Sequence, residues 1–78
     1  QAGVSLASIA VSSEEPGMVI RYATALDFQY TLEASPTLGE DALWMPVGAP
    51  EAGDNHLRAV TVPASGQAQF FRLRREPL

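Results

Sequence analysis

The chain has 78 residues and no cysteine, which allows one small domain without a disulfide bond or a thiolate metal site. Its formal net charge is −4, from nine acidic residues against five arginines, and this balance disfavours binding to nucleic acid. No apolar run approaches the roughly 20 residues needed to cross a bilayer, so membrane insertion is not expected.

Two strands open the chain. Residues 4–13 alternate between apolar and polar with a change of phase, so a kink half-way along would turn apolar residues of both parities inward. Residues 14–17 contain the Pro-Gly pair typical of a turn, and residues 18–23 alternate again. Because the turn is short, we expect the two strands to pair as a hairpin.

The middle of the chain contains the clearest strand. Apolar and polar residues alternate over residues 28–34, which predicts a strand with one buried face. A loop follows, in which Leu38 is expected to plug the edge of the core. Residues 43–47 form a short strand, and Pro46, which has no backbone N–H, predicts a position at a sheet edge.

The last third begins with residues 48–55, an acidic and turn-rich stretch that we predict to be a mobile loop. Residues 56–62 alternate, with the two valines directed inward and Arg58 near the open end of the strand. After a turn, residues 67–74 form the final strand. Its arginines predict a second protected sheet edge.

These elements predict an all-β fold, a small antiparallel β-sandwich of six or seven strands. No segment has a helical apolar period, so no helix longer than one turn is expected. One domain covers residues 1–78, and because the chain begins at Gln1 rather than methionine we expect it to be excised from a longer chain. The expected core comprises the inward-facing residues Leu6, Ile9, Val11, Ile20, Tyr22, Phe28, Tyr30, Leu32, Trp44, Val60, Val62, Phe71 and Leu73.

Three short blocks carry a resemblance to a known type of module: Tyr-Thr-Leu-Glu-Ala-Ser at 30–35, Trp44 with Val47, and Gln-Phe-Phe-Arg-Leu-Arg at 69–74. The chain resembles small β-sandwich repeats of large secreted bacterial proteins and polysaccharide-active enzymes, although Phe71 stands where their pattern more often has tyrosine. The resemblance implies an immunoglobulin-like or fibronectin-type-III-like sandwich at an extracellular or cell-surface location. It also implies a non-catalytic accessory role, in which the module packs against or spaces neighbouring domains of the same polypeptide.

Candidate catalytic and metal-binding groups do not form a recognisable pattern. His56 follows a turn and has no partner nucleophile in sequence, so we interpret it as a solvated residue at a strand end. Residues 51–55 offer acidic and amide oxygens but lack the alternating spacing of a calcium loop. We therefore predict no enzyme activity, no catalytic residues, no metal and no cofactor.

An aromatic platform for sugar rings is the alternative function, with Trp44, Tyr22 and Tyr30 as its ligand-binding residues and polysaccharide as the partner. The two tyrosines share parity with core residues, which favours their burial. A lone tryptophan in a small sandwich is usually a core residue as well. The sequence alone leaves the exposure of Trp44 open.

Overall fold

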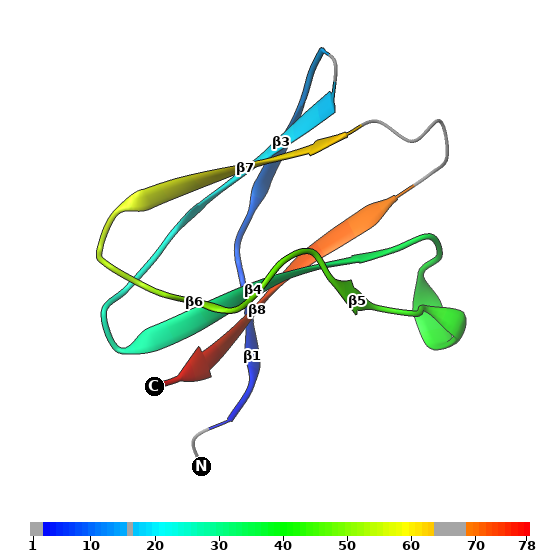
Figure 1. The fold of residues 1–78 in the computed structure, drawn as a ribbon. Coiled ribbons are helices and arrows are strands. Elements are labelled where there is room, and N and C mark those ends of the chain that lie inside the picture. Colours follow the sequence, from blue (N-terminus) through cyan, green and yellow to red (C-terminus); the bar gives the residue numbers. More distant parts are fainter. Residues whose placement is uncertain (1–2, 16, 64–68) are drawn as a thin grey trace.

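The computed structural model describes residues 3–15, 17–63 and 69–78, which form two antiparallel sheets facing each other (Figure 1). These residues contain no α-helix and a single 3₁₀ turn, η1, at Gly39–Asp41. The predicted all-β sandwich is therefore confirmed. Pro16 of the first predicted turn, most of the last turn, and the first two residues of the predicted final strand lie outside the described residues.

The first sheet has the strand order β2–β3–β7, with β2 at Ala10–Glu14, β3 at Gly17–Ala23 and β7 at Leu57–Pro63. The β2–β3 hairpin is paired as predicted, and β3 lies in the middle of the sheet. Val60 pairs with Ile20 and faces the interior, while Arg58 lies opposite Tyr22 near the end of the strand, as its position in the alternation predicted.

The second sheet has the order β1–β8–β4–β5, with β1 at Ser5–Ala7, β8 at Phe70–Pro77, β4 at Phe28–Ser35 and β5 at Met45–Pro46. Another short strand, β6 at Glu51–Ala52, pairs with the first half of β4. The prediction that the last strand lies at an edge is wrong, because β1 pairs with its far side. The proline-containing β5 does lie at an edge, as predicted.

The described residues form eight strands rather than six or seven. The stretch predicted as one strand over residues 4–13 divides at Ser8 and Ile9, where the chain leaves the second sheet and enters the first. The predicted kink is thus a change of sheet. The eighth strand, β6, was not predicted because two residues are too few to produce an alternation.

The core lies between the sheets, and all six residues of its central cluster were predicted. Val19, which is 9% exposed, is also buried but was not among the predicted core residues. The central cluster is Ile20, Tyr22, Tyr30, Leu32, Val62 and Leu73, and Ile9, Phe28, Val60 and Phe71 pack against it partly buried. Full burial of each large side chain stabilises the fold by about 1.5–3 kcal/mol. Because the cluster draws on both sheets, it holds the two layers together.

Four predictions of burial are wrong. Leu6 pairs with Arg74 on the outer side of the second sheet and is 62% exposed, because Ala7 and Ile9 reach the core at the change of sheet. Val11 and Leu38 are also exposed, the first on the edge strand β2 and the second in the loop before η1. Trp44 is half-buried and does not belong to the core cluster.

Candidate functional site

The three aromatic residues of the predicted platform do not lie together. Tyr22 and Tyr30 are 7% and 4% exposed, and their ring centroids lie 6.1 Å apart across the interior. The Tyr30 hydroxyl accepts a hydrogen bond of 2.8 Å from the backbone N–H of Ala25. Both tyrosines therefore serve the core, as their parity indicated, and only Trp44 remains a candidate for contact with a ligand.

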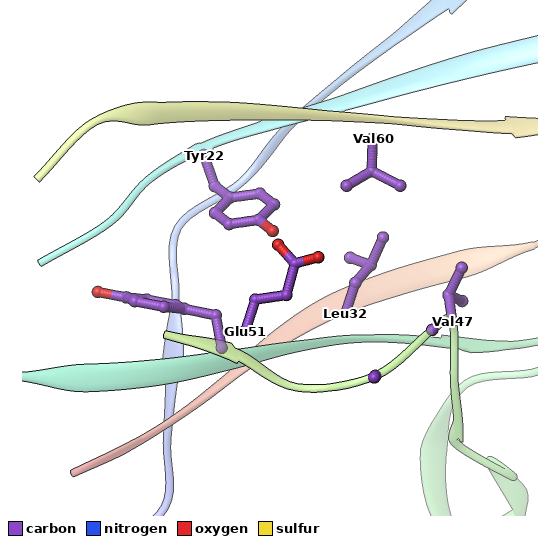
Figure 2. Close-up of a pocket in the computed structure, with 8 residues that line it drawn as sticks. Tyr22, Leu32, Val47, Glu51 and Val60 are labelled. Atoms are coloured by element: carbon purple, nitrogen blue, oxygen red, sulfur yellow. The ribbon is translucent and has the colours of Figure 1, made fainter. Parts of the chain in front are cut away.

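A small cavity opens between the sheets beside the two tyrosines (Figure 2). In the figure Tyr22 and Val60 descend from the first sheet, Leu32 rises from the second, and the Glu51 carboxylate points toward the Tyr22 ring. The remaining walls come from the chain between β5 and β6. The cavity thus has an apolar floor with a phenol and a carboxylate at one side.

Arg58 holds the polar side of this cavity in place. Its guanidinium forms ion pairs with Glu51, at 2.5 Å, and with Asp54, at 3.4 Å, and donates a hydrogen bond to the Ala52 carbonyl. Burial raises the pKa of the Tyr22 phenol, the Glu51 charge raises it further, and the Arg58 charge opposes the rise. Tyr22 therefore stays protonated and neutral at physiological pH.

The cavity has a volume of about 120 Å³. Pockets for drug-sized ligands occupy roughly 300–1,000 Å³. This space fits a few water molecules or one inserted side chain rather than a sugar ring. The charge of Glu51 is already paired with Arg58, so the cavity offers no free charge from that carboxylate to attract an ion.

A second arrangement lies on the outer side of the second sheet and centres on Glu33. This residue faces outward from β4, as its parity predicted, yet it is only 6% exposed. Arg72, directly opposite on β8, donates a 2.6 Å hydrogen bond to its carboxylate. The guanidinium carbon of Arg72 lies 4.4 Å from the centre of the Trp44 ring. One cation thus pairs with a buried carboxylate and stacks on an indole.

Glu33, Arg72 and Trp44, together with their neighbours on β1, β8 and β4, lie on the outer side of the second sheet. The register aligns Leu6 with Arg74 and Thr31 in one row, and Phe70 with Ser35 in another, on either side of the Arg72–Glu33 row. We call this surface the β8 face: Leu6, Thr31, Glu33, Trp44, Phe70, Arg72 and Arg74. It combines exposed apolar side chains with two arginines and the single tryptophan of the chain.

Sequence reasoning placed Glu33 on the correct side of its strand but missed its partner. Opposite charges on neighbouring strands attract when they lie directly across from each other. The opposite charges of Glu33 and Arg72 are visible in the sequence. They did not predict the ion pair, because the two residues are 39 positions apart and the alternation within each strand does not give the register between strands.

Residues 48–55, predicted as a mobile loop, are fastened at several points. The Asp54 carboxylate accepts a hydrogen bond from the Thr24 hydroxyl at 3.1 Å, and the Gly53 N–H donates to the Phe28 carbonyl at 2.8 Å. His56 is exposed, and its ring lies near the carbonyl and carboxylate of Asp54. Among the described residues, no three His, Cys, Asp or Glu side chains gather in a way that could hold a metal ion.

Comparison with protein-family models, with curated proteins and with solved structures gives no match for this chain. In the part of the chain that the structure describes, no helix is long and apolar enough to cross a membrane. The chemistry of the β8 face and of the small cavity is therefore the basis for assigning a role.

Proposed function

We propose that this chain is a non-catalytic accessory module of a larger exported bacterial protein, in which it packs against a neighbouring domain of the same polypeptide. The β8 face supplies the contact surface. The export and the bacterial origin rest on the resemblance carried by residues 30–35, Trp44 and residues 69–74.

The composition of the β8 face is the observation that carries the proposal. Tryptophan and arginine are enriched among the few residues that dominate binding energy at protein interfaces. Here Trp44 and Arg72 are already stacked, and Glu33 fixes the guanidinium, so little side-chain freedom remains to be lost on binding. The exposed Leu6 and Phe70 on either side supply apolar area. Such a surface suits a preorganised protein contact.

The order of strands supports an immunoglobulin-like assignment within this proposal. Immunoglobulin constant domains keep strands A, B and E in one sheet and C, F and G in the other. The order β2–β3–β7 corresponds to A–B–E, and β4–β8 corresponds to C–F. The first strand, β1, stands in the position of G. Many cell-surface domains share this sandwich architecture.

Titration of the ¹⁵N-labelled chain with the separately produced flanking domain tests the proposal. The indole N–H of Trp44 gives a single resonance, because the chain has one tryptophan. We expect this resonance and the amides of Arg72 and Arg74 to shift on addition of the flanking domain. Leu6→Asp should weaken the association at least about tenfold, since it places a charge in an apolar contact.

Leu26→Asp is the matched control, because Leu26 has nearly the same exposure as Leu6 but lies in the β3–β4 connection. It should bind the flanking domain as the parent does. An equal loss of affinity for the flanking domain in Leu6→Asp and Leu26→Asp, or no shift of the Trp44 indole resonance, would contradict the proposed surface.

The alternative role, carbohydrate binding through Trp44, is favoured by one observation, the half-exposed indole on an open sheet face. Flat apolar rings stack on sugars, and an exposed tryptophan is suited to this contact. Addition of soluble polysaccharides to the same labelled chain separates the two roles. A saturable shift of the Trp44 indole with polysaccharide, and none with the flanking domain, would replace domain packing by carbohydrate binding.

A further inference from the structure

Strand β7 is the longest open edge among the described residues. Its seven residues pair with β3 on one side only, at the end of the β2–β3–β7 sheet (Figure 1). The other edge strands are shorter: β1 has three residues, β2 five, and β5 and β6 two each. An unpaired strand of this length is a template for another strand.

The backbone groups on the open side can be assigned from the register. The Thr24 N–H donates to the His56 carbonyl at 3.2 Å, in line with the register that pairs Ile20 with Val60. In an antiparallel pair, hydrogen-bonded and non-hydrogen-bonded positions alternate. Val60 therefore turns its N–H and C=O toward β3, whereas Leu57, Ala59 and Thr61 turn theirs away from the sheet. In the described part of the chain, these three residues have no backbone hydrogen bond on that side.

The edge strand β7 has few of the usual protections over its central residues. Proteins guard edges with lysine, proline, bulges or inward-pointing charged residues. The strand has no lysine, and its proline stands at the last position, Pro63. Its one charge, Arg58, faces the interior, but it is already paired with Glu51 and Asp54 of the same chain and so opposes an incoming strand less than an unpaired charge would. By contrast, β5 carries Pro46.

The open edge is complementary to itself. When two copies of β7 run antiparallel about Ala59, Ala59 lies opposite Ala59 of the second copy, and Leu57 lies opposite Thr61. Every outward N–H and C=O of these residues then finds a partner. On the inner side Arg58 meets Val60 rather than another Arg58, so no like charges are opposed. The small alanine at the two-fold axis brings no steric conflict.

We propose that β7 pairs antiparallel with β7 of a second copy of this chain, which joins two three-stranded sheets into one continuous sheet. This contact lies in the opposite layer from the β8 face, so it is independent of the proposed packing against a neighbouring domain. Pairing along one strand buries less than a standard protein interface, so the dimer is weak and depends on protein concentration.

Sedimentation equilibrium of the parent chain over a range of concentrations measures the dimer directly. Amide hydrogen exchange, recorded at low and high concentration, tests its geometry. We expect protection of the Leu57, Ala59 and Thr61 amides to rise with concentration, while the Val60 amide, already bonded to β3, does not change. A chain that stays monomeric throughout, or protection without this alternation, would overturn the proposal.

Charge variants at Ala59 provide the matched test, because this exposed side chain points away from the core. Ala59→Lys and Ala59→Glu each oppose like charges across the two-fold axis, so each should weaken the dimer at least about tenfold. An equimolar mixture of the two should recover association as a heterodimer. The control is Ala10→Lys, since Ala10 lies in the same row and on the same side at the other edge of the sheet.

Each variant must first retain the thermal midpoint of the parent, which shows that the fold is intact. An Ala10→Lys chain that loses the dimer, or an Ala59 mixture that stays monomeric, would overturn pairing through β7.

Discussion

Gly53 shows how closely the backbone packs where the chain turns from β6 toward β7. A Cβ atom built there would overlap the Ala25 carbonyl and lie 2.9 Å from Cε1 of Tyr30. The backbone angles of Gly53 are ordinary, so its requirement for glycine comes from space alone. Gly53→Ala must displace either Tyr30 or the 24–27 segment.

We expect Gly53→Ala to lower the free energy of unfolding by about 1–3 kcal/mol, which is typical of overpacking. Urea denaturation followed by circular dichroism measures the change. Gly3→Ala is the control, because a Cβ at Gly3 meets nothing within 4 Å. A Gly53→Ala chain as stable as the Gly3→Ala chain would mean that the 48–55 loop does not pack as described.

Leu32 and Leu6 are two leucines that the alternation placed in the core with equal weight, but only Leu32 is buried. Leu32→Ala leaves a cavity between the sheets and should lower the free energy of unfolding by about 2–5 kcal/mol. Leu6→Ala removes an exposed side chain and should change it by less than about 0.5 kcal/mol. Thermal or urea denaturation of both variants gives the comparison, and similar losses would contradict the assigned change of sheet at Ser8.

Alternation predicted the buried cluster correctly because it depends only on the local geometry of each strand, which turns every second side chain to one face. Leu6, Val11 and Trp44 were misplaced because their burial depends on what lies across from them. Val11 shares a face with Ile20 but sits on an edge strand. Trp44 lies outside regular strand, and the tyrosine pair fills the interior that a lone tryptophan usually occupies.

At the scale of elements, the pairing of β4 with β8 depends on a charged pair as well as on the core. Glu33 is nearly inaccessible to water, so its carboxylate relies on Arg72 for compensation. Arg72→Met should lower the free energy of unfolding by about 1–3 kcal/mol, because it leaves a buried acceptor without its donor. It should also change the fluorescence of Trp44, which loses the stacked guanidinium.

A double-mutant cycle with Glu33→Gln measures the interaction energy between Glu33 and Arg72, separately from the contacts that each makes with other residues. The Glu33→Gln/Arg72→Met chain should lose less stability than the sum of the single variants, because no charge remains buried. Strict additivity in urea denaturation would show that the two side chains contribute independently.

Asp54 lies just before β7 and ties this segment to Thr24, which follows β3. Its titration gives a second prediction at this scale. Burial by itself would raise the pKa of Asp54, but hydrogen bonds from the Thr24 hydroxyl and the His56 N–H, with the Arg58 charge, together hold it below its ordinary value of 3.8. Ionised Asp54 therefore stabilises the folded chain above pH 3.8, and this contribution is lost as the pH falls through the lowered pKa of the folded state.

NMR of the carboxyl resonances between about pH 2 and pH 6 measures the pKa of Asp54 in the folded chain. Thr24→Val removes one donor without much change of shape, and it should move the midpoint of Asp54 upward toward the unfolded value. Glu40→Gln, a change in the exposed turn η1, serves as the control. An Asp54 midpoint that does not respond to Thr24→Val would contradict the hydrogen bond that ties the loop.

Sequence reasoning at this scale found the β2–β3 hairpin and the proline edge, both of which depend on neighbouring residues or on one residue's chemistry. It put β8 at an edge, although β8 lies between β1 and β4. The pairing of β1 with β8 joins the two ends of the chain, at registers such as Leu6 with Arg74. Such pairings depend on topology, which local patterns do not encode.

For the whole molecule, the arrangement predicts that the two sheets unfold together. Ile20 from the first sheet and Leu73 from the second are fully buried in the same cluster, so neither layer keeps its interior without the other. A chain of 78 residues buries only a modest fraction of its surface, which is enough for one small core. That core is shared by the two sheets. Unfolding should therefore be a single two-state transition.

Trp44 tests this cooperativity because it lies on the outer side of the second sheet, away from Ile20. In the parent chain, urea transitions followed by Trp44 fluorescence and by far-ultraviolet circular dichroism should coincide. Ile20→Ala should lower the free energy of unfolding by about 2–5 kcal/mol and move both transitions together, although the change is in the other sheet. Ser13→Ala, at an exposed position of β2, should leave both midpoints in place. A Trp44 transition that stays at the parent midpoint in Ile20→Ala would mean that the second sheet is stable alone and that the two layers do not share one core.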